Sequence, residues 1–485
     1  MAEQEAGASR TRIEVNGINE ITDAERKGTP RQLFWPWFGA NVSVLAISYG
    51  SFVLGFGVSF AQAVLVGVVG VVVSFVFCGI VGVAGKRGSV PTMVLSRAAF
   101  GVRGNALPTV ISWVLTVGWE TVLTITATLA TATVLGRLGL GGGPVTLVLA
   151  LLVVAALVVG AGVLGFDVIM RAQLVITVIT GVLTVVYVVL VAGTVDVAAV
   201  MALPAGPPGA VIGALVLVLT GFGMGWVNVA ADYTRYLPRA ASERGIVVWT
   251  TVGASLAPVV LLIVGLLLAG SSTELSTAIA ADPIGALTAA LPTWFLVPFA
   301  LTAVLGLVGG AVLDIYSSGL ALLSLGLPAP RWVAALIDGA LMVIGTVYVV
   351  FVAQEFLPQF TGFLITLGVP VAAWCGVLLA DIALRRTYAA DELYRSDGRY
   401  GAVRWPAVIL LVVATVLGWG LVTNSQVAWL TWQGYLLDLG LGGREGPWAY
   451  ANLGVLLALA LCFVVTLLTS AATVRAQEGT SAARR

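Results

Sequence analysis

The sequence contains no histidine and only three cysteines in 485 residues. Without histidine, His-containing metal sites and Ser-His or Cys-His nucleophile pairs are excluded. Cys78, Cys375 and Cys462 each lie within an apolar run, which argues against a disulfide framework or a cysteine-based metal site. These absences predict no metal and no cofactor, and they leave few kinds of enzyme site.

An intramembrane diaspartyl protease is the enzyme class that the composition leaves open. Asp314 and Asp338 lie in neighbouring apolar runs, as the two aspartates of such a site would. Their contexts are Leu-Asp-Ile-Tyr and Ile-Asp-Gly-Ala, and not the Tyr-Asp and Gly-x-Gly-Asp sequences of these proteases. The chain is therefore not expected to be an enzyme.

Charged residues are also scarce, at 10% of the chain against 59% hydrophobic residues, and the mean hydropathy is +1.04. A net charge of +1 without a compact basic region argues against nucleic-acid binding. A membrane-spanning helix needs about 20 mostly apolar residues, and the apolar runs lack the period-2 alternation of barrel strands. The predicted fold is an all-α polytopic membrane protein with twelve transmembrane helices, which begin near Trp37, Gln62, Ala106, Val145, Leu174, Gly209, Ile246, Phe295, Trp332, Phe360, Trp405 and Asn452.

Lysine and arginine set the predicted orientation. With the N-terminus inside, all but two of the 24 Lys and Arg residues fall in the terminal tails or the inner loops, and only Arg137 and Arg444 fall outside. This distribution follows the positive-inside rule. The first thirty residues lack the apolar core of a signal peptide. We expect a multi-pass protein of the cell membrane with both termini in the cytoplasm, and the sequence makes no prediction of oligomeric state.

Glycine is abundant, and the tripeptide Gly-Phe-Gly occurs at residues 55–57 in the first segment and at residues 221–223 in the sixth. Glycine costs about 1 kcal/mol in a helix interior relative to alanine. Both tripeptides are therefore predicted to break their helices. Matching breaks in two halves suggest one fold unit used twice, and broken helices line the binding sites of transporters.

Glu120 lies in the middle of the third segment, where charged residues are rare and usually functional. Thr116, Trp119, Glu120, Leu123 and Thr124 follow the spacing of a single helix stripe, so the tryptophan and the carboxyl group are expected to share one face. The alternative is that Trp119 packs against a neighbouring helix and Glu120 is a structural hydrogen-bonding group.

Asp314 makes a similar case in the eighth segment. Gly310, Asp314, Ser317 and Ser318 fall on one stripe, as expected beside a polar cavity or a tight helix contact. Close packing alone would account for the glycine and the serines. It would not account for the aspartate, because a buried carboxylate needs a partner or a proton.

The sixth segment places Gly221, Gly225, Trp226 and Asn228 close together in sequence. If the helix unwinds there, backbone groups become available to a ligand and Trp226 can present an aromatic face. The alternative is a glycine-packed helix crossing. At the inner end of this segment, the spacing of Asp232 and Arg235 predicts a local ion pair.

Four motifs in the right order resemble one known family. They are residues 85–101 between segments two and three, Gly118-Trp119, Gly225-Trp226 with residues 230–238, and residues 314–319. Together they resemble the purine-cytosine permease branch of the nucleobase:cation symporter family, and the likeness runs from about Trp35 to Leu468.

The resemblance implies a fold like that of the leucine transporter, with two inverted repeats of five helices and two extra C-terminal helices. The implied boundaries are a cytoplasmic tail at 1–34, a transporter domain at 35–471 with repeats at about 35–196 and 208–382 and extra helices at about 404–471, and a cytoplasmic tail at 472–485. In the family, a heterocycle stacks between an aromatic of segment three and one of segment six. Polar groups of segments one, three, six and eight read its edge, and the site residues that this implies here are Trp119, Trp226, Glu120, Asp314, Gly225, Gly55, Ser51 and Asn228.

Two departures from the family pattern bear on the substrate. Leu123 stands where the family often has an amide side chain, and Asp314 stands where it often has Asn. An acidic residue favours a ligand with paired N–H donors, so a purine or cytosine is the first expectation. The alternatives are a hydantoin, allantoin, a vitamin ring or an amino acid carried by the same fold, and a non-transporting receptor or channel.

The coupling cation is expected to be a proton and not sodium. The relatives hold sodium with backbone carbonyls of segment one and with hydroxyl groups of segment eight, about one turn before the Asn or Asp position. That turn reads Gly309-Gly310 here. Glu120 and Asp314 instead offer two buried carboxyl groups as proton carriers. The expected partners are thus a nucleobase, a proton and the lipid bilayer.

Overall fold

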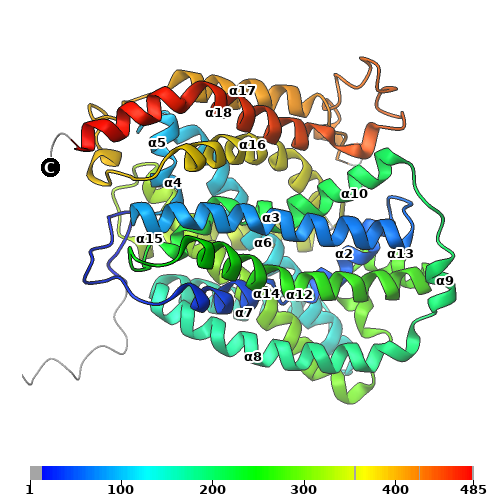
Figure 1. Ribbon diagram of the computed structural model, residues 1–485. Coiled ribbons are helices and arrows are strands. Elements are labelled where there is room, and N and C mark those ends of the chain that lie inside the picture. Colours follow the sequence, from blue (N-terminus) through cyan, green and yellow to red (C-terminus); the bar gives the residue numbers. More distant parts are fainter. Residues whose placement is uncertain (1–13, 354–356, 425–426, 483–485) are drawn as a thin grey trace, which may run out of the picture.

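The computed structural model describes residues 14–353, 357–424 and 427–482, and these ranges contain helices and no strand (Figure 1). The predicted all-α class is confirmed. In lipid, a helix satisfies its backbone hydrogen bonds within its own segment, which is why apolar runs of this length fold as helices.

Ten of the described segments are long and apolar enough to cross a membrane. Helices α1 (Phe34–Asn41) and α2 (Leu45–Leu54) form one further span with a bend of 66°, and α17 (Trp405–Trp419) is a shorter apolar helix. Each of the twelve predicted segments therefore has a helical counterpart. The remaining spans are α3 (Phe60–Gly88), α6 (Ala106–Arg137), α7 (Pro144–Leu164), α8 (Phe166–Val191), α10 (Pro208–Gly221) with α11 (Ala230–Thr234), α12 (Glu243–Ser271), α14 (Thr293–Ser324), α15 (Arg331–Tyr348), α16 (Leu357–Leu384) and α18 (Leu453–Ala482).

Two pairs of corresponding helices in the two predicted repeats have equal lengths. Helices α3 and α12 have 29 residues each, and α6 and α14 have 32 each. The first segment of each repeat is interrupted, between α1 and α2 in the first and between α10 and α11 in the second. This arrangement is the expected inverted repeat of five and five helices. The exact domain boundaries stay a prediction.

The break in the first span is not at residues 55–57, so that prediction is wrong. The helix is interrupted at Val42, where φ is −79° and ψ is 69°, between Asn41 and Leu45. Gly55 is the helical C-cap of α2, and Gly57, with φ of 71°, turns the chain toward α3. These glycines therefore end the span, where a positive φ is needed to reverse the chain.

The predicted break in the sixth span is confirmed. Helix α10 ends at Gly221, and two short 3₁₀ turns, Gly223–Gly225 and Val227–Val229, lead to α11. A Cβ atom at Gly223 would lie 2.3 Å from the backbone of Ser74 in α3. Only glycine lets the unwound segment approach α3 this closely.

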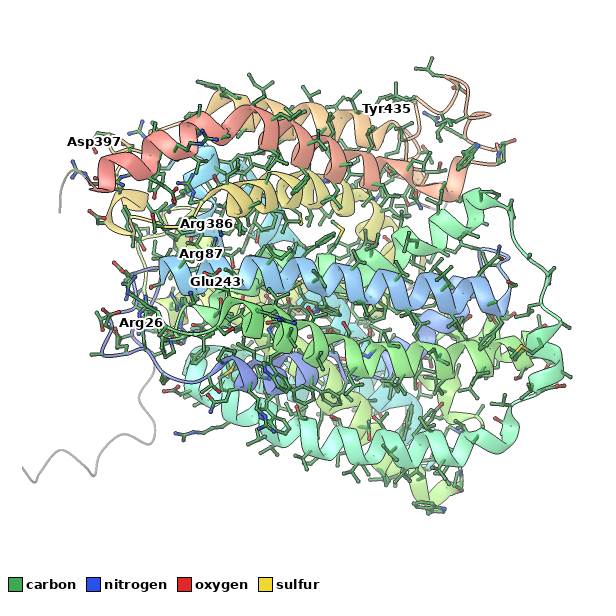
Figure 2. All side chains as sticks on the ribbon, in the orientation of Figure 1. Arg26, Arg87, Glu243, Arg386, Asp397 and Tyr435 are labelled. Atoms are coloured by element: carbon green, nitrogen blue, oxygen red, sulfur yellow. The ribbon has the colours of Figure 1, made fainter. Side chains whose placement is uncertain are left out.

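One end of the bundle carries the N-terminal segment, here residues 14–29, and the connections around Arg87 and Arg386, and we call it the basic end (Figure 2). Helix α18 also ends there and continues to Ala482, through most of the predicted tail at 472–485. The Gln477 side chain accepts a hydrogen bond of 2.8 Å from Arg385, and the Glu478 carboxylate accepts one of 2.7 Å from the Arg386 backbone N–H. These bonds hold the last turns against the α16–α17 connection. The helix therefore runs on past the apolar stretch.

Candidate functional site

A central cavity lies where the two helix breaks face α6. Its volume is about 50 Å³, which is room for a few water molecules and well below the roughly 300–1,000 Å³ of sites that hold small molecules. The walls must therefore separate for a ligand to enter. The lining residues are Ala40, Asn41, Ser43, Leu45, Ala46, Tyr49, Trp119, Leu123, Gly221, Phe222 and Trp226.

Trp119 and Trp226 line this same cavity, one from α6 and one from the unwound part of the sixth span. Their side chains are 8% and 9% exposed. The Trp226 ring packs edge-on against Trp37 with centroids 5.8 Å apart, and the Trp119 ring packs edge-on against Phe360 at the same separation. The indole N–H of Trp119 has no acceptor within the described part of the chain. The cavity thus has two aromatic walls and one free donor.

Gly225 and Gly221 allow the close approach of the two breaks to their neighbours. A Cβ atom at Gly225 would lie 2.7 Å from Nε1 of Trp119, and one at Gly221 would lie 2.1 Å from the hydroxyl oxygen of Tyr49. Real Cβ atoms do not approach other atoms this closely. Gly225 therefore lies beside the cavity although it is not one of the lining residues, and its part in substrate binding stays a prediction.

The cavity also contains polar residues that sequence reasoning missed. The Asn41 side chain donates to the carbonyl of Trp37 at 2.8 Å, the Ser43 hydroxyl accepts from the Leu45 N–H at 3.3 Å, and the Tyr49 hydroxyl donates to the carbonyl of Gly221 at 3.3 Å. Asn41 and Ser43 are two polar residues in the middle of an apolar run. These two polar residues mark the position at which the first span is interrupted.

Gly55 and Ser51 do not reach the central cavity. Both line a second pocket of about 670 Å³, together with residues of α10 such as Gly209 and Ala210. Figure 1 shows α10 toward the end of the bundle opposite the basic end. The Ser51 hydroxyl lies 2.8 Å from that of Ser276 and donates to the Ser276 carbonyl at 2.9 Å, which connects α2 to α13 (Thr273–Ala281). In this arrangement the two residues line the second pocket and not the cavity that holds the tryptophan pair.

Aromatic side chains separate the central cavity from this second pocket. Phe360 of α16 packs 6.2 Å from both Tyr49 and Phe52, and Phe222 packs 4.6 Å from Tyr49, measured between ring centroids. We call Tyr49, Phe52, Phe222 and Phe360 the aromatic cluster. Its members come from α2, the sixth-span break and α16.

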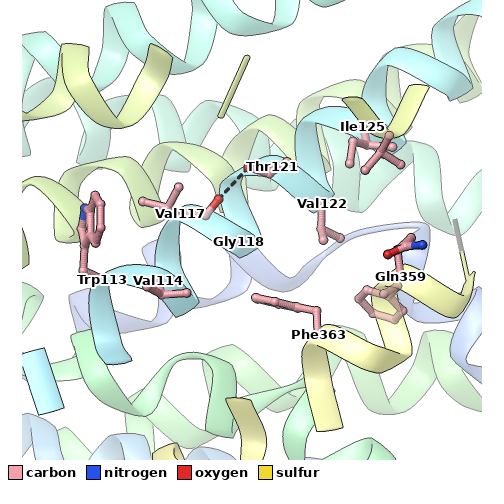
Figure 3. Close-up of a pocket in the computed structure, with 11 residues that line it drawn as sticks. Trp113, Val114, Val117, Gly118, Thr121, Val122, Ile125, Gln359 and Phe363 are labelled. Atoms are coloured by element: carbon pink, nitrogen blue, oxygen red, sulfur yellow. Dashed lines mark hydrogen bonds between the residues drawn. The ribbon is translucent and has the colours of Figure 1, made fainter. Parts of the chain in front are cut away.

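A third pocket of about 340 Å³ lies between α6 and α16 and is almost wholly apolar (Figure 3). The hydroxyl group of Thr121 there already donates to the carbonyl of Val117 at 2.7 Å. The indole N–H of Trp113 donates to Asp338 at 2.8 Å. Because these polar groups have partners, this pocket suits a polar ring less well than the central cavity does.

Asn228 is buried in the unwound sixth span but does not line the cavity. Its amide donates to the Ser112 hydroxyl at 2.8 Å and so attaches the break to α6.

Asp232 and Arg235 do not form the predicted ion pair. Asp232 accepts from the backbone N–H and hydroxyl group of Thr92, whereas Arg235 donates to the Gly17 carbonyl at 2.6 Å. Helix α11 ends at Thr234, which lets the Arg235 side chain turn toward the N-terminal segment.

Glu120 and Asp314 are buried, at 0% and 1% exposure, and neither lines the central cavity. Their four carboxyl oxygens have no well-formed hydrogen bond within the described part of the chain.

Trp119 and Glu120 do not share one face of α6, in contrast to the prediction. Consecutive residues of an α-helix lie about 100° apart, so the indole faces the cavity while the carboxyl group faces α14 and α15. Burying an isolated carboxylate without a partner is costly.

The end of α1 packs closely on the glycines of α14, and the side-chain oxygen of Gln173 lies beside them, 3.4 Å from a Cβ atom placed at Gly309. A Cβ atom at Gly309 would lie 3.0 Å from the Gly39 carbonyl oxygen, and one at Gly310 would lie 3.4 Å from that of Ala40. The amide of Gln173, from α8, donates to the Gly309 carbonyl at 2.6 Å. The Gly309 carbonyl at this crossing therefore already accepts a hydrogen bond from the neutral amide of Gln173.

Three kinds of comparison place the chain among transporters. The family described as permeases for cytosine/purines, uracil, thiamine and allantoin matches residues 20–438. YxlA of Bacillus subtilis (strain 168), a candidate purine-cytosine permease, is 24% identical over 423 residues, which cover 84% of this chain and 87% of that protein.

Solved structures agree in fold. Mhp1, a nucleobase-cation-symport-1 family transporter, in a closed conformation with bromovinylhydantoin bound, matches with a TM-score of 0.70 at 17% identity over 96% of both chains. Its inward-facing conformation matches with a TM-score of 0.66 at 16% identity, over 98% of this chain and 96% of that one. A mutant of the manganese transporter of Eremococcus coleocola matches with a TM-score of 0.56 at 13% identity, over 96% of this chain and 99% of that one. With the family match across most of its length, this chain belongs to the family of permeases for cytosine/purines, uracil, thiamine and allantoin, as a multi-pass secondary transporter and not an enzyme.

Proposed function

We propose that the protein imports a purine or cytosine-type nucleobase by alternating access, with protons as the coupling cation. The observation that carries this proposal is the position of Trp119 and Trp226 on one small cavity between the two helix breaks. Each base that stacks on an aromatic side chain gains about 1–3 kcal/mol. A flat ring between the two indoles would gain stacking free energy from both.

The polar groups of the cavity favour an uncharged heterocycle. No charged side chain is among its lining residues, whereas an amino acid would need partners for its ammonium and carboxylate groups. Asn41, Ser43, Tyr49 and the free N–H of Trp119 can form hydrogen bonds with ring nitrogens and carbonyls. Such bonds set specificity, because a buried polar group left unpaired costs about 1–3 kcal/mol.

The aromatic cluster supplies a gate for alternating access. It lies between the central cavity and the larger pocket at the end opposite the basic end. Rotation of α16 away from Tyr49 and Phe52 would admit substrate from that side. The N-terminal segment and the arginines at the basic end would close the other side, and both must open in turn.

Protons fit the buried groups better than sodium does. The α1–α14 crossing offers backbone carbonyls and the side-chain oxygen of Gln173 but no hydroxyl ligand at Gly309 or Gly310, and the Gln173 amide nitrogen already donates to one of those carbonyls. Sodium, a hard cation, prefers several oxygen ligands. Within the described part of the chain, Glu120 and Asp314 lie buried without a cationic partner, and each can bind and release a proton.

The orientation follows from charge. The basic end carries the N-terminal segment and the loops rich in Lys and Arg, so we place it in the cytoplasm, with both termini, of a cell membrane. Apolar side chains such as Val178, Val182 and Val185 of α8 are more than half exposed and would face the lipid.

A hydantoin is the second candidate substrate, because Mhp1 shares this fold and was solved with bromovinylhydantoin bound. A ligand screen on purified protein decides between the candidates. Adenine, guanine, cytosine, allantoin, a hydantoin and an amino acid are added one at a time, and thermal stabilisation is measured. We expect a nucleobase to raise the unfolding temperature most, with the effect lost in Trp119→Ala. Stabilisation by the amino acid alone would overturn the proposal.

A further inference from the structure

Asp338 is a buried carboxyl group that the proposed transport mechanism has not yet used. It lies on α15 and is 0% exposed. One of its oxygens accepts a hydrogen bond of 2.8 Å from the indole N–H of Trp113, and the other has no well-formed partner within the described part of the chain. A carboxyl group confined in this way keeps one oxygen free to gain or lose a proton.

Ser318 of α14 lies between Asp338 and Glu120. The turn of α14 that carries it packs on α15, where a Cβ atom at Gly319 would lie 3.6 Å from the Ala334 side chain and from the Ala335 backbone nitrogen. The Ser318 hydroxyl group interacts with both carboxyl groups without a well-formed hydrogen bond to either. The hydroxyl itself makes only a long bond of 3.3 Å to the carbonyl of Ile315. This hydroxyl group is therefore not held by a strong partner and is available to the two carboxyl groups.

The groups that face Asp338 are acidic. Helix α6 contributes Glu120, which interacts with Asp338 and also with Asp314 of α14, whereas α7 contains no Asp, Glu, Lys or Arg. Arg331, two turns away on α15, donates to the Gly162 carbonyl at 2.6 Å and lies 3.5 Å from Glu14. The described part of the chain contains no group of three acidic, His or Cys side chains placed to hold a metal ion. Without a cation nearby, like charges disfavour ionising two of these carboxyl groups together.

We propose that Asp338 is a third proton carrier of the transport cycle and exchanges a proton with Glu120 through the hydroxyl group of Ser318. In the transfer, protonated Glu120 gives its proton to the Ser318 oxygen while the serine proton passes to the free oxygen of the Asp338 carboxylate. One O–H bond forms and one breaks on the serine, Glu120 becomes a carboxylate and Asp338 becomes neutral. The inference rests on the proposed proton coupling, and it makes Asp338 a coupling residue that does not touch the substrate.

The test compares Asp338→Asn with the exposed control Asp438→Asn in proteoliposomes. Asparagine preserves the acceptor for Trp113 but cannot carry the proton. We expect uphill uptake driven by a pH gradient to fall at least about tenfold in Asp338→Asn, with a much smaller loss in substrate counterflow, which needs no net proton movement. Uphill uptake and a pH profile equal to those of Asp438→Asn would overturn the inference.

A second test compares Ser318→Ala with Ser318→Thr. Both variants preserve the carboxyl groups of Glu120, Asp314 and Asp338. We expect Ser318→Ala to slow uphill uptake and Ser318→Thr to restore it, because only threonine keeps the hydroxyl group. If Asp338→Asn does not fold, this pair decides, and equal uphill uptake in both variants overturns the inference. A wild-type protein that no pH gradient drives would instead refute the proposed coupling itself, so the two failures are distinguishable.

Discussion

The carboxylate of Glu14 lies 3.7 Å from the guanidinium group of Arg235, a contact that joins the N-terminal segment to the broken sixth span. The same carboxylate lies 3.5 Å from Arg331 and accepts hydrogen bonds from the hydroxyl groups of Tyr236, at 2.5 Å, and Tyr316, at 3.1 Å. Both arginines are buried. One carboxylate thus stabilises two buried cations that come from different spans.

Glu14→Gln is expected to loosen the basic end. Breaking a buried ion pair by removing one partner costs about 3–5 kcal/mol, because the remaining charge is left uncompensated. Hydrogen–deuterium exchange at residues 14–29 and 231–237 should therefore rise. Glu20→Gln is the matched control, since the pair of Glu20 with Arg239 is exposed and worth little. Equal exchange in the two variants would show that Glu14 does not hold this end closed.

Trp119→Ala and Trp226→Ala are each expected to abolish saturable uptake while the protein still reaches the membrane. Loss of one stack of about 1–3 kcal/mol weakens binding roughly 5- to 150-fold. Isothermal titration with the best ligand from the screen measures this directly. Trp294→Ala, at an exposed tryptophan, controls for the loss of an indole. Unchanged affinity in either cavity variant would remove that residue from the site.

Gly221→Ala and Gly55→Ala should differ sharply, although both glycines lie at helix ends. The new Cβ atom at Gly221 would clash with the Tyr49 hydroxyl group at 2.1 Å, whereas the nearest atom to one at Gly55 is the Phe52 carbonyl oxygen at 3.2 Å. Overpacking of this kind costs about 1–3 kcal/mol, so we expect Gly221→Ala to lower thermal stability and stop uptake. A normal unfolding temperature and normal turnover in Gly221→Ala would contradict the close approach of the two breaks.

Phe360→Ala is expected to weaken the gate without removing a cavity wall. The variant removes the ring contacts with Tyr49, Phe52 and Trp119. Bound substrate should then escape faster toward the end opposite the basic end, measured as an increased dissociation rate of radiolabelled ligand. Phe363→Ala, which also touches Trp119 but not Tyr49 or Phe52, is the control. A larger effect in the control would place the gate elsewhere.

Uptake should rise as the external pH falls and collapse with a protonophore. Protonation of Glu120 and Asp314 removes the cost of a buried charge, so a proton from outside favours the loaded, closed form. Glu120→Gln and Asp314→Asn mimic the protonated groups and should each lose the pH dependence. Sodium added to purified protein should not raise its unfolding temperature. Strict dependence on external sodium, with pH dependence intact in both variants, would falsify proton coupling.

The membrane spans and one of the two helix breaks could be predicted from the local sequence, because lipid offers the backbone no hydrogen-bond partners. Each apolar run must satisfy its own backbone hydrogen bonds, so run length alone determined the spans. The break at residues 221–223 was also visible, since glycines in a helix interior have no packing gain to offset their entropy cost. The tryptophan pair was found through the motifs that surround Trp119 and Trp226.

Other features depended on which helices pack side by side. The break at Val42 contains no glycine and is formed where α1 meets the glycines of α14, so a search for glycines placed it wrongly at Gly55. Trp119 and Glu120 are neighbours in sequence, yet α16 packs against the first while α14 and α15 surround the second. A stripe pattern predicts that a helix face is buried, but the tertiary arrangement decides what covers it. For the same reason only the folded chain brings Asp338, Ser318 and Glu120 together from three separate spans.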